Sequence, residues 1–446
     1  MDAQSDGQNA AQENENAVIT WLQHNSIPVQ HVEAGNGFSD LQPLKQVLKG
    51  VKVVGLGETT HGTREIFQMK HRLLEFLVTE MGFNTFAVEA SFAACQPIND
   101  YVLYGKGDRA TVLTGQWYVV WDTEVFSDML DWLRAYNQKV PDEKKVKFQG
   151  LDITRNEIGR EAVLDYLRKV APGRLSVTGT LFEALAKEEA KWPMRIDEET
   201  KKTLLLLLPQ LQEVIDHLMA NKNSFVSGSS LSEFEQALQY TRVMKQFILD
   251  NAADLLPPLQ AKGTGRSISM AENLIYCVDR AEPDAKFIIS AHNGHIIVAD
   301  DSIEEPTLGS CLRAKYGPEY FAFGFEFNQG SFHTRTELPD KLLGDLKEVT
   351  LLPAAAESLS WYLSHTNMNV LILNLRAPVV NSVVDHWFNT PQKVHSANWA
   401  YNAAESDYLY LDTPRKKYDG IIFIERTTAS HPTANALRTI SNRDGL

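Results

Sequence analysis

The sequence VKVVGLG at residues 51–57 is a short apolar run that predicts a buried β-strand. Residues 63–81 then place apolar side chains at spacings of three and four, which predicts an amphipathic helix. Gly82 is suited to end that helix, because glycine readily adopts the left-handed conformation found just beyond many helix ends. Residues 84–88 form a second apolar run and predict the next strand. This alternation of strand, helix and strand predicts a parallel sheet with right-handed crossovers.

The same alternation recurs along the chain but is interrupted by a helical middle stretch. Residues 156–280 carry Leu, Glu, Lys and Gln in helical periods, which predicts about four to six helices and no strand. Elsewhere a further helix is predicted at 123–137, and further strands at 146–151, 286–290, 320–327, 369–375 and 420–424. We therefore expect an α/β fold, in which a mostly parallel sheet is flanked by helices and carries a helical insertion or cap.

These patterns also predict how the chain is divided. The polar residues at the N-terminus cannot bury enough apolar surface to fold by themselves, and the last residues are polar as well. The predicted parts are a disordered tail at 1–16, an α/β catalytic core at 17–155 and 281–430, a helical insertion forming part of the cleft at 156–280, and a loose C-terminal tail at 431–446.

Composition narrows the classes of partner and the cellular compartment. The 446 residues carry a net charge of −14, which argues against nucleic acid or an anionic membrane as the main partner. Only three cysteines are present, without the spacing of a metal or redox motif, which is typical of buried thiols in a reducing compartment. The longest purely apolar run, Leu204 to Leu208, is far too short to span a membrane. We expect a cytoplasmic protein that acts on a small molecule.

Ionisable residues follow several of the predicted strands at the point where each strand ends. Ligands of open parallel sheets bind beyond the carboxyl ends of the strands, so these side chains are expected to converge. They are Glu58, His61, Glu89, Asp152, His292 and His295. The motifs GxSxG, HExxH and GxxxxGK[ST] are absent, which argues against a serine nucleophile, a zinc protease site and a phosphate-binding loop. The remaining candidates for catalysis are histidines and carboxylates, which can activate water.

A dinucleotide site is a competing interpretation of the first strand and its turn. Gly55 and Gly57 follow the strand, and the acidic Glu89 ends the next one. Three details weaken this interpretation: Thr60 occupies the third glycine position, Glu58 would place a negative charge against a pyrophosphate, and Glu89 comes 32 residues after Gly57. We therefore favour hydrolysis over nucleotide binding.

Six blocks of the sequence, in order across roughly residues 50–300, resemble the erythromycin esterase family. The blocks are Gly57–Glu65, Phe86–Ala90, Trp121–Arg134, Phe148–Asp152, Met270–Asn273 and Ala291–His295. The resemblance implies an esterase that opens the macrolactone ring of macrolide antibiotics by attack of water, and thereby antibiotic resistance. It implies His61 as the general base, with support from Glu58, His292 and His295. It also implicates an arginine and a glutamate on the following helix, for which Arg72 and Glu75 are the nearest matches.

The chemistry of the residues agrees with this and leaves several roles open. A histidine titrates near neutral pH, and a carboxylate from Glu58 or Glu89 could hold one tautomer of His61. Arg72 or His295 could donate to a developing oxyanion. However, Arg72 and Glu75 belong to a polar stripe of the predicted helix, and such a stripe is usually a solvated face.

Substrate contacts and metal binding also stay open. Trp117, Trp121 and Asp152 could line a substrate cleft, with core packing as the alternative for the tryptophans. We expect no cofactor, although the same histidines and carboxylates could bind a divalent metal. The alternatives are a metal-dependent hydrolase of another ester, an amide or a phosphoester, and a small-molecule binding protein without catalysis.

Overall fold

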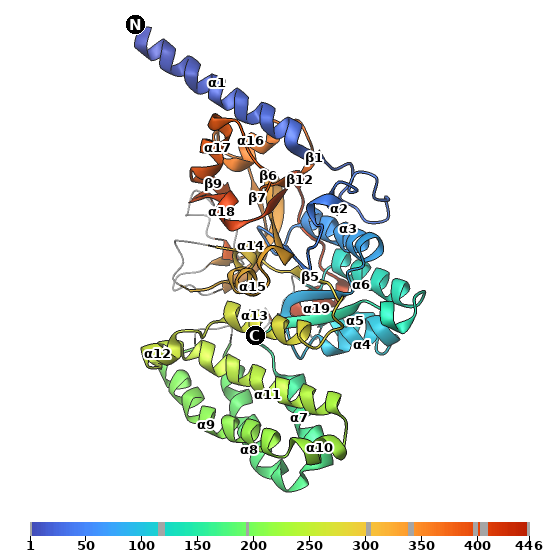
Figure 1. Ribbon diagram of the computed structural model, residues 1–446. Coiled ribbons are helices and arrows are strands. Elements are labelled where there is room, and N and C mark those ends of the chain that lie inside the picture. The colour runs from blue at the N-terminus through green and yellow to red at the C-terminus, as the bar shows by residue number, and fades with distance from the viewer. Residues whose placement is uncertain are drawn as a thin grey trace. The chain divides into compact units, whose positions relative to one another are not determined.

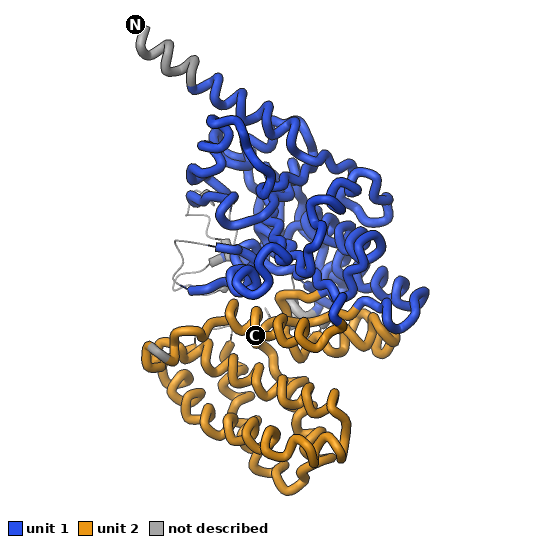
Figure 2. Tube along the Cα trace, viewed as in Figure 1, with its two compact units in different colours: residues 1–86, 118–146, 283–446 blue, residues 87–117, 147–282 orange. Residues whose placement is uncertain are grey.

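The computed structural model describes residues 2–114, 121–192, 196–299, 305–337, 343–395, 400–401 and 409–443. The chain forms two compact units, shown in two colours in Figure 2. Unit 1 contains residues 1–86, 118–146 and 283–446, and unit 2 contains residues 87–117 and 147–282. The helical stretch predicted at 156–280 lies in unit 2, which also takes in residues 87–117 and 147–155.

Unit 1 is built on a mostly parallel β-sheet flanked by helices (Figure 1). Its strands follow the order β1-β8-β12-β6-β2-β5, and β7 and β10 also pair with β6. The pairs β2–β5, β2–β6, β6–β12 and β6–β10 are parallel, whereas β1–β8, β8–β12 and β6–β7 are antiparallel. The strands are β1 Ser26–Pro28, β2 Val53–Leu56, β5 Phe287–Ser290, β6 Tyr320–Glu337, β7 Leu343–Leu351, β8 Val370–Asn374, β10 Ala400–Tyr401 and β12 Gly420–Thr427. The α/β class and the mostly parallel sheet predicted from the sequence are confirmed.

Strand β2 and the helix after it follow the sequence pattern closely. All four residues of β2 are buried, as a strand covered on both faces requires. Helix α3, Arg64–Met81, ends at Gly82, whose φ of 73° is the left-handed conformation expected there. The other helices of unit 1 are α1 Asp2–Asn25, α2 Leu44–Val47, α6 Glu124–Asn137, α14 Asn293–Ile296, α15 Leu308–Tyr316, α16 Leu359–Ser364, α17 Ser382–Asn389, α18 Pro414–Lys417 and α19 Ala434–Arg443. Strands β9 Gln392–His395 and β11 Leu409–Asp412 form a separate antiparallel pair.

The described structure has a helix near each end of the chain. Residues 2–16, predicted as a disordered tail, begin helix α1, whose last turns anchor it by burying Val18 and Leu22. The ring of Trp21 also packs edge-on against Phe388 of α17, with 5.2 Å between ring centroids. At the other end, residues 434–443 of the predicted loose tail form α19.

Unit 2 is mainly helical and has its own hydrophobic core. Strand β3 is Thr85–Ser91, and its residues from 87 onward belong to unit 2. Strand β4 is Lys147–Asp152. The helices are α4 Gln96–Tyr104, α5 Arg109–Thr114, α7 Glu157–Val170, α8 Leu175–Glu189, α9 Glu198–Ala220, α10 Lys222–Ser227, α11 Leu231–Asn251, α12 Pro258–Ala261 and α13 Arg266–Val278. Helix α9 packs against both α8 and α11, and the core between them includes the fully buried Leu204, Leu211 and Phe247. In the described part of the chain, no helix is long and apolar enough to cross a membrane.

Candidate functional site

A tight turn joins β2 to α3 and carries two of the predicted site residues, Glu58 and His61. The turn fits against its neighbours only because it is flanked by glycines. A Cβ atom at Gly57 would collide with the side-chain oxygen of Asn293, and one at Gly62 would collide with the carbonyl oxygen of His333. The backbone of this turn is therefore held in one position by close approach to other strands.

Glu58 and His61 form a hydrogen-bonded pair within the turn. The distance from His61 Nδ1 to Glu58 Oε1 is 2.7 Å. Glu58 is fully buried, whereas 16% of the His61 side chain is exposed. A carboxylate can only accept, so the pairing places the imidazole hydrogen on Nδ1 and, in the neutral ring, a basic lone pair on Nε2. This tautomer is the one that a general base needs.

Lys70, which the sequence analysis does not single out, lies beside this pair. It is completely buried on α3, and its Nζ donates to Glu58 Oε2 and, at 2.9 Å, to Ser290 Oγ at the end of β5. The ammonium group offsets the negative charge of this buried carboxylate, which would be costly to bury without an opposite charge nearby. A signal was present in the sequence: Lys70 stands at helical spacing from the apolar Ile66 and Leu73, on the face that becomes the core.

His292 lies close to the pair and is fixed in its own tautomer. Its Nδ1 accepts from the backbone N–H of Gly294 at 3.1 Å, so its hydrogen is on Nε2, which lies 3.3 Å from the carbonyl oxygen of Thr59. The ring centroids of His61 and His292 are 5.3 Å apart. The predicted convergence of Glu58, His61 and His292 is therefore present in the structure.

The residue after His292 connects the ends of β2 and β5 to strand β6. The backbone N–H of Asn293 donates to the carbonyl oxygen of Glu58 at 2.8 Å. The amide side chain of Asn293 both donates to and accepts from the backbone of Phe325 on β6, at 2.9 and 3.0 Å. His295, half-buried on the short helix α14, donates its backbone N–H to the carbonyl oxygen of His292 at 2.9 Å. The catalytic role of its side chain stays a prediction.

Aromatic packing covers one side of the His61 ring. Trp121 is 2% exposed, and its ring centroid lies 6.2 Å from that of His61 and 5.6 Å from that of Phe67. Trp121 thus packs in the core and borders the site at the same time. Trp117, predicted as a second cleft wall, lies outside the described residues.

The segment after β12 is tied to the same turn. The backbone N–H of Ser430 donates to the carbonyl oxygen of Gly62 at 2.8 Å, and that of Arg64 donates to the carbonyl oxygen of Thr428 at 2.9 Å. Both the N–H and the hydroxyl of Thr428 donate to the carboxylate of Glu65, each at 2.6 Å. The turn that carries His61 is therefore fixed from two sides, and no short-range pattern in the sequence pointed to this.

Glu89 and Asp152 come together in unit 2, where β3 and β4 end. Arg266 joins them: its Nη2 donates to Glu89 Oε1 at 3.1 Å and to Asp152 Oδ2 at 2.8 Å, and its Nε donates to Asp152 Oδ1 at 3.0 Å. Both carboxylates are buried, so the guanidinium is the charge that makes this arrangement possible. The sequence analysis does not identify Arg266. A role for Glu89 beside His61, or for Asp152 in substrate binding, stays a prediction.

Arg72 and Glu75 bind a loop of unit 1 instead of the Glu58–His61 pair. Arg72 donates to the carboxylate of Asp40 at 2.6 and 3.0 Å and to the carbonyl oxygens of His31 and Gly37. Glu75 accepts from the backbone N–H of a glycine in the same loop, Gly35, at 2.9 Å. The stripe that would usually face solvent is buried here because this loop covers it. These contacts give both residues a part in holding the loop, and their expected catalytic role stays a prediction.

Replacing Arg72 with methionine is expected to destabilise the fold without changing the chemistry. Burial raises the pKa of Asp40, but hydrogen bonds from Arg72 and the Gln30 N–H outweigh this, so the net pKa lies below its ordinary value. Without Arg72 the carboxylate of Asp40, only 4% exposed, loses its positively charged partner, so the free energy of unfolding should fall by about 3 kcal/mol. Urea unfolding measures the change. Arg168→Met, at an exposed pair with Asp165, is the control, with a change of at most about 1 kcal/mol. A large loss of kcat in folded Arg72→Met would contradict the structural role.

His71 makes stability depend on pH in a defined direction. Burial lowers the pKa of His71 to about 4, so the folded protein keeps this ring neutral where an unfolded chain protonates it. The free energy of unfolding should therefore fall as pH drops from about 6.5 to 4, by at most about 3 kcal/mol from this group. Chemical unfolding of wild type and His71→Leu at several pH values tests this. The variant should show the shallower slope, and equal slopes would contradict the assignment.

Metal binding has no ready set of ligands in the part of the chain that the structure describes. No group of three or more His, Cys, Asp or Glu side chains is arranged there to hold an ion. Glu58 is engaged by both His61 and Lys70, and an ammonium group beside a carboxylate competes with a cation for it.

Comparison with known proteins gives a consistent result. The family model described as erythromycin esterase matches residues 78–427. The chain is 26% identical over 429 residues to erythromycin esterase type II of Escherichia coli, covering 92% of this chain and 98% of the relative. A crystal structure of a Bacillus cereus protein is similar with a TM-score of 0.79 at 25% identity, covering 94% of this chain and 99% of that one. An erythromycin esterase mutant in its open conformation has the same fold, with a TM-score of 0.65 at 16% identity, over 90% and 96% of the two chains.

Proposed function

We propose, from the premise that the chain belongs to the erythromycin esterase family, that it hydrolyses a carboxylic ester or lactone with His61 as the general base. The observation that carries the proposal is the 2.7 Å hydrogen bond between His61 Nδ1 and the buried carboxylate of Glu58. Hydrolases that use water directly need a base that is neutral near pH 7 and fixed in one tautomer. The hydrogen bond to Glu58, whose other oxygen accepts from Lys70, fixes the tautomer of His61 that such a base needs.

The reaction proceeds in two steps. His61 Nε2 removes a proton from water while the oxygen attacks the carbonyl carbon, which forms a tetrahedral intermediate with its charge on the former carbonyl oxygen. Glu58 stabilises the imidazolium that forms. The intermediate then collapses, the carbon–oxygen bond to the leaving group breaks, and the imidazolium returns its proton to the departing alkoxide. The products are a carboxylic acid and an alcohol, which for a lactone are two ends of the same molecule. His295 is the proposed donor to the oxyanion.

A macrolide lactone is the substrate that we propose. The support is the similarity, along nearly the whole chain, to a relative named erythromycin esterase type II. Ring opening of a macrolide would confer antibiotic resistance, and we place the protein in the cytoplasm, where its three free cysteines stay reduced.

A screen in heavy-oxygen water tests both the reaction and the substrate. Purified protein is incubated separately with a macrolide, a simple lactone and a linear ester, and the masses of the products are measured by mass spectrometry. The expected result is the gain of one water with the heavy oxygen in the carboxylate, since water attacks the acyl carbon. Activity that disappears on chelation and returns with a divalent metal would favour a metal-dependent hydrolase instead. Tight binding without turnover would favour a binding protein.

A further inference from the structure

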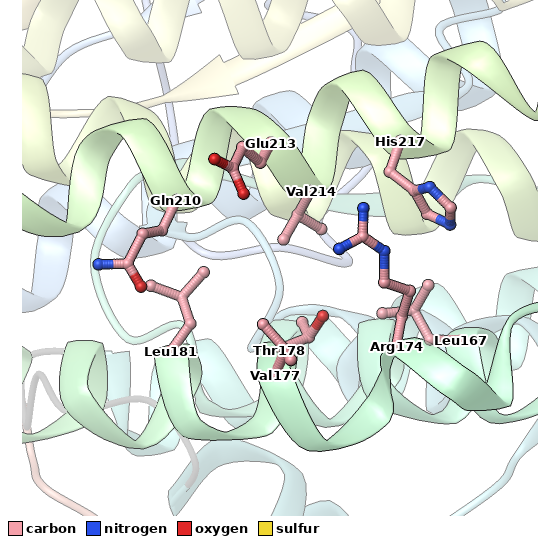
Figure 3. Close-up of a pocket in the computed structure, with 9 residues that line it drawn as sticks. All are labelled: Leu167, Arg174, Val177, Thr178, Leu181, Gln210, Glu213, Val214 and His217. Carbon is pink, nitrogen blue, oxygen red and sulfur yellow. The ribbon is translucent and has the colours of Figure 1, made fainter.

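Unit 2 has an open depression between α8 and α9 that offers no defined site for a ligand (Figure 3). Arg174 and Glu213 both line it, and both are exposed to solvent. Exposed groups of opposite charge beside valine and leucine side chains are typical of an ordinary solvated surface. In unit 1, by contrast, several hydrogen bonds around the Glu58–His61 pair converge on one segment of the chain.

Residues 428–433, which we call the strap, connect β12 to α19. The first half of the strap is bound to the turn that follows β2. Ala429 pairs with Thr63 in an antiparallel bridge. The backbone N–H of Ser430 donates to the carbonyl oxygen of Gly62 at 2.8 Å. These contacts place the backbone of the turn directly beside the strap.

The second half of the strap is bound to the segment that precedes α6. Pro432 pairs with Thr123 in an antiparallel bridge. The backbone N–H of Thr433 donates to the carbonyl oxygen of Asp122 at 2.9 Å. The side chains add a further bond, because the hydroxyl of Thr433 donates to Asp122 Oδ1. The strap therefore joins the turn after β2 to the start of α6.

The bond between Thr433 and Asp122 is the side-chain anchor of this second half. Asp122 is only 4% exposed. Burial raises the pKa of Asp122, and the hydrogen bond from Thr433 offsets part of that rise by stabilising the charged form. A hydrogen bond to a carboxylate is stronger than one between neutral groups, so this contact adds to the backbone bonds that hold residue 122 in place.

Trp121 directly precedes Asp122 and packs beside the proposed general base. Its ring centroid lies 6.2 Å from that of His61 and 5.5 Å from that of Phe126. The residue that follows each ring of the His61–Trp121 contact, Gly62 or Asp122, is hydrogen-bonded to the strap. A change in the strap should therefore alter how the two rings face each other, and with it the direction of His61 Nε2.

We propose that the strap is a positioning element of the hydrolase site, with Thr433 as its side-chain anchor. Through Asp122, Thr433 holds the indole of Trp121 against the imidazole of His61, so that Nε2 keeps the direction in which it meets water. Thr433 and Asp122 are positioning residues, because they act through these two rings. The effect on kcat rests on the proposed function, whereas the effect on the ring of His61 is measured without a substrate.

NMR of the full chain, labelled with ¹⁵N at its histidines, tests the positioning directly. The ring signals of His61 are assigned by their loss in His61→Ala. Thr433→Val removes the hydroxyl and keeps the shape of the side chain, so these signals should shift or broaden. Thr433→Ser keeps the donor and should leave them in place.

The matched control lies on the helix that follows the strap. Thr433 Oγ also accepts from the backbone N–H of Ala436 at 3.2 Å, so Thr433→Val loosens the start of α19 as well. Ala436→Gly weakens the same turn, because glycine has a low helix propensity, but leaves the bond to Asp122 intact. The ring signals of His61 in Ala436→Gly should therefore match those of the wild type.

Steady-state kinetics on a substrate from the screen gives the second readout. Thr433→Val should lower kcat about tenfold, because a small displacement of the base is costly. KM should change less than about twofold, since Trp121 is only 2% exposed. Asp122→Ala should have a similar effect, and the double variant should fall no further, because both changes remove one contact. Asp122→Asn keeps an oxygen acceptor without the charge, so it should cause smaller changes, and it supplies the same test if Thr433→Val does not fold.

Two results would overturn the proposal. Unchanged ring signals of His61 in Thr433→Val, with circular dichroism showing that the variant is folded, would show that the strap does not position this ring. Equal losses of kcat in Thr433→Val and Ala436→Gly would assign the effect to α19 instead of the bond to Asp122. Failure of the wild type to hydrolyse any ester or lactone would overturn the proposed function, and the NMR comparison would still decide whether the strap positions His61.

Discussion

Replacing Lys70 with methionine is expected to lower the free energy of unfolding by about 3–5 kcal/mol, because it leaves a fully buried carboxylate without its cation. The variant also loses the hydrogen bond to Ser290. Hydrolysis should fall at the same time, since the carboxylate that orients His61 is no longer held from its other side. Urea unfolding and the initial rate at saturating substrate measure the two effects.

A lysine in an exposed ion pair is the matched control for the buried Lys70. Lys45 forms an ion pair with Glu80, but 43% of its side chain is exposed, so Lys45→Met should change the free energy of unfolding by at most about 1 kcal/mol. The double variant Glu58→Gln/Lys70→Met removes both charges of the buried pair, so it should be more stable than Lys70→Met alone. Equal, small effects of Lys70→Met and Lys45→Met would contradict the structural importance of Lys70.

Glu58→Gln should reduce kcat by about 10²–10⁴-fold, because the amide no longer fixes one tautomer of His61 or stabilises the imidazolium that forms. The substrate's KM should change little, since the buried Glu58 is turned toward His61 and Lys70. Steady-state kinetics on the best substrate of the screen gives both constants. Glu58→Asp keeps the charge and should retain more activity than Glu58→Gln. A Glu58→Gln variant with wild-type kcat would show that this carboxylate has no part in the reaction.

Much of the fold was accessible from the sequence because local patterns determine it. The buried run at 51–57 and the amphipathic period at 63–81 correspond to β2 and α3, and Gly82 ends the helix as expected. The closeness of Glu58, His61 and His292 could also be predicted, because parallel strands end at the same edge of a sheet.

Other features depend on long-range packing that no local pattern encodes. Arg72 and Glu75 look solvated on their helix, but a loop at residues 31–40 covers them and takes their hydrogen bonds. Lys70 stands on the apolar face of the same helix, and only the structure shows that Glu58 lies opposite it. A charged residue at a core position of a helix therefore indicates a buried charged partner, which local sequence cannot identify.

Removing the imidazole of residue 61 and supplying another one in solution tests whether this ring activates water. His61→Ala should lose about 10²–10⁴-fold in kcat, and free imidazole in the buffer should restore part of the rate in a concentration-dependent way. His386→Ala, at an exposed histidine of α17, should behave as wild type with and without imidazole. Full activity of His61→Ala in the absence of imidazole would show that His61 is not the general base.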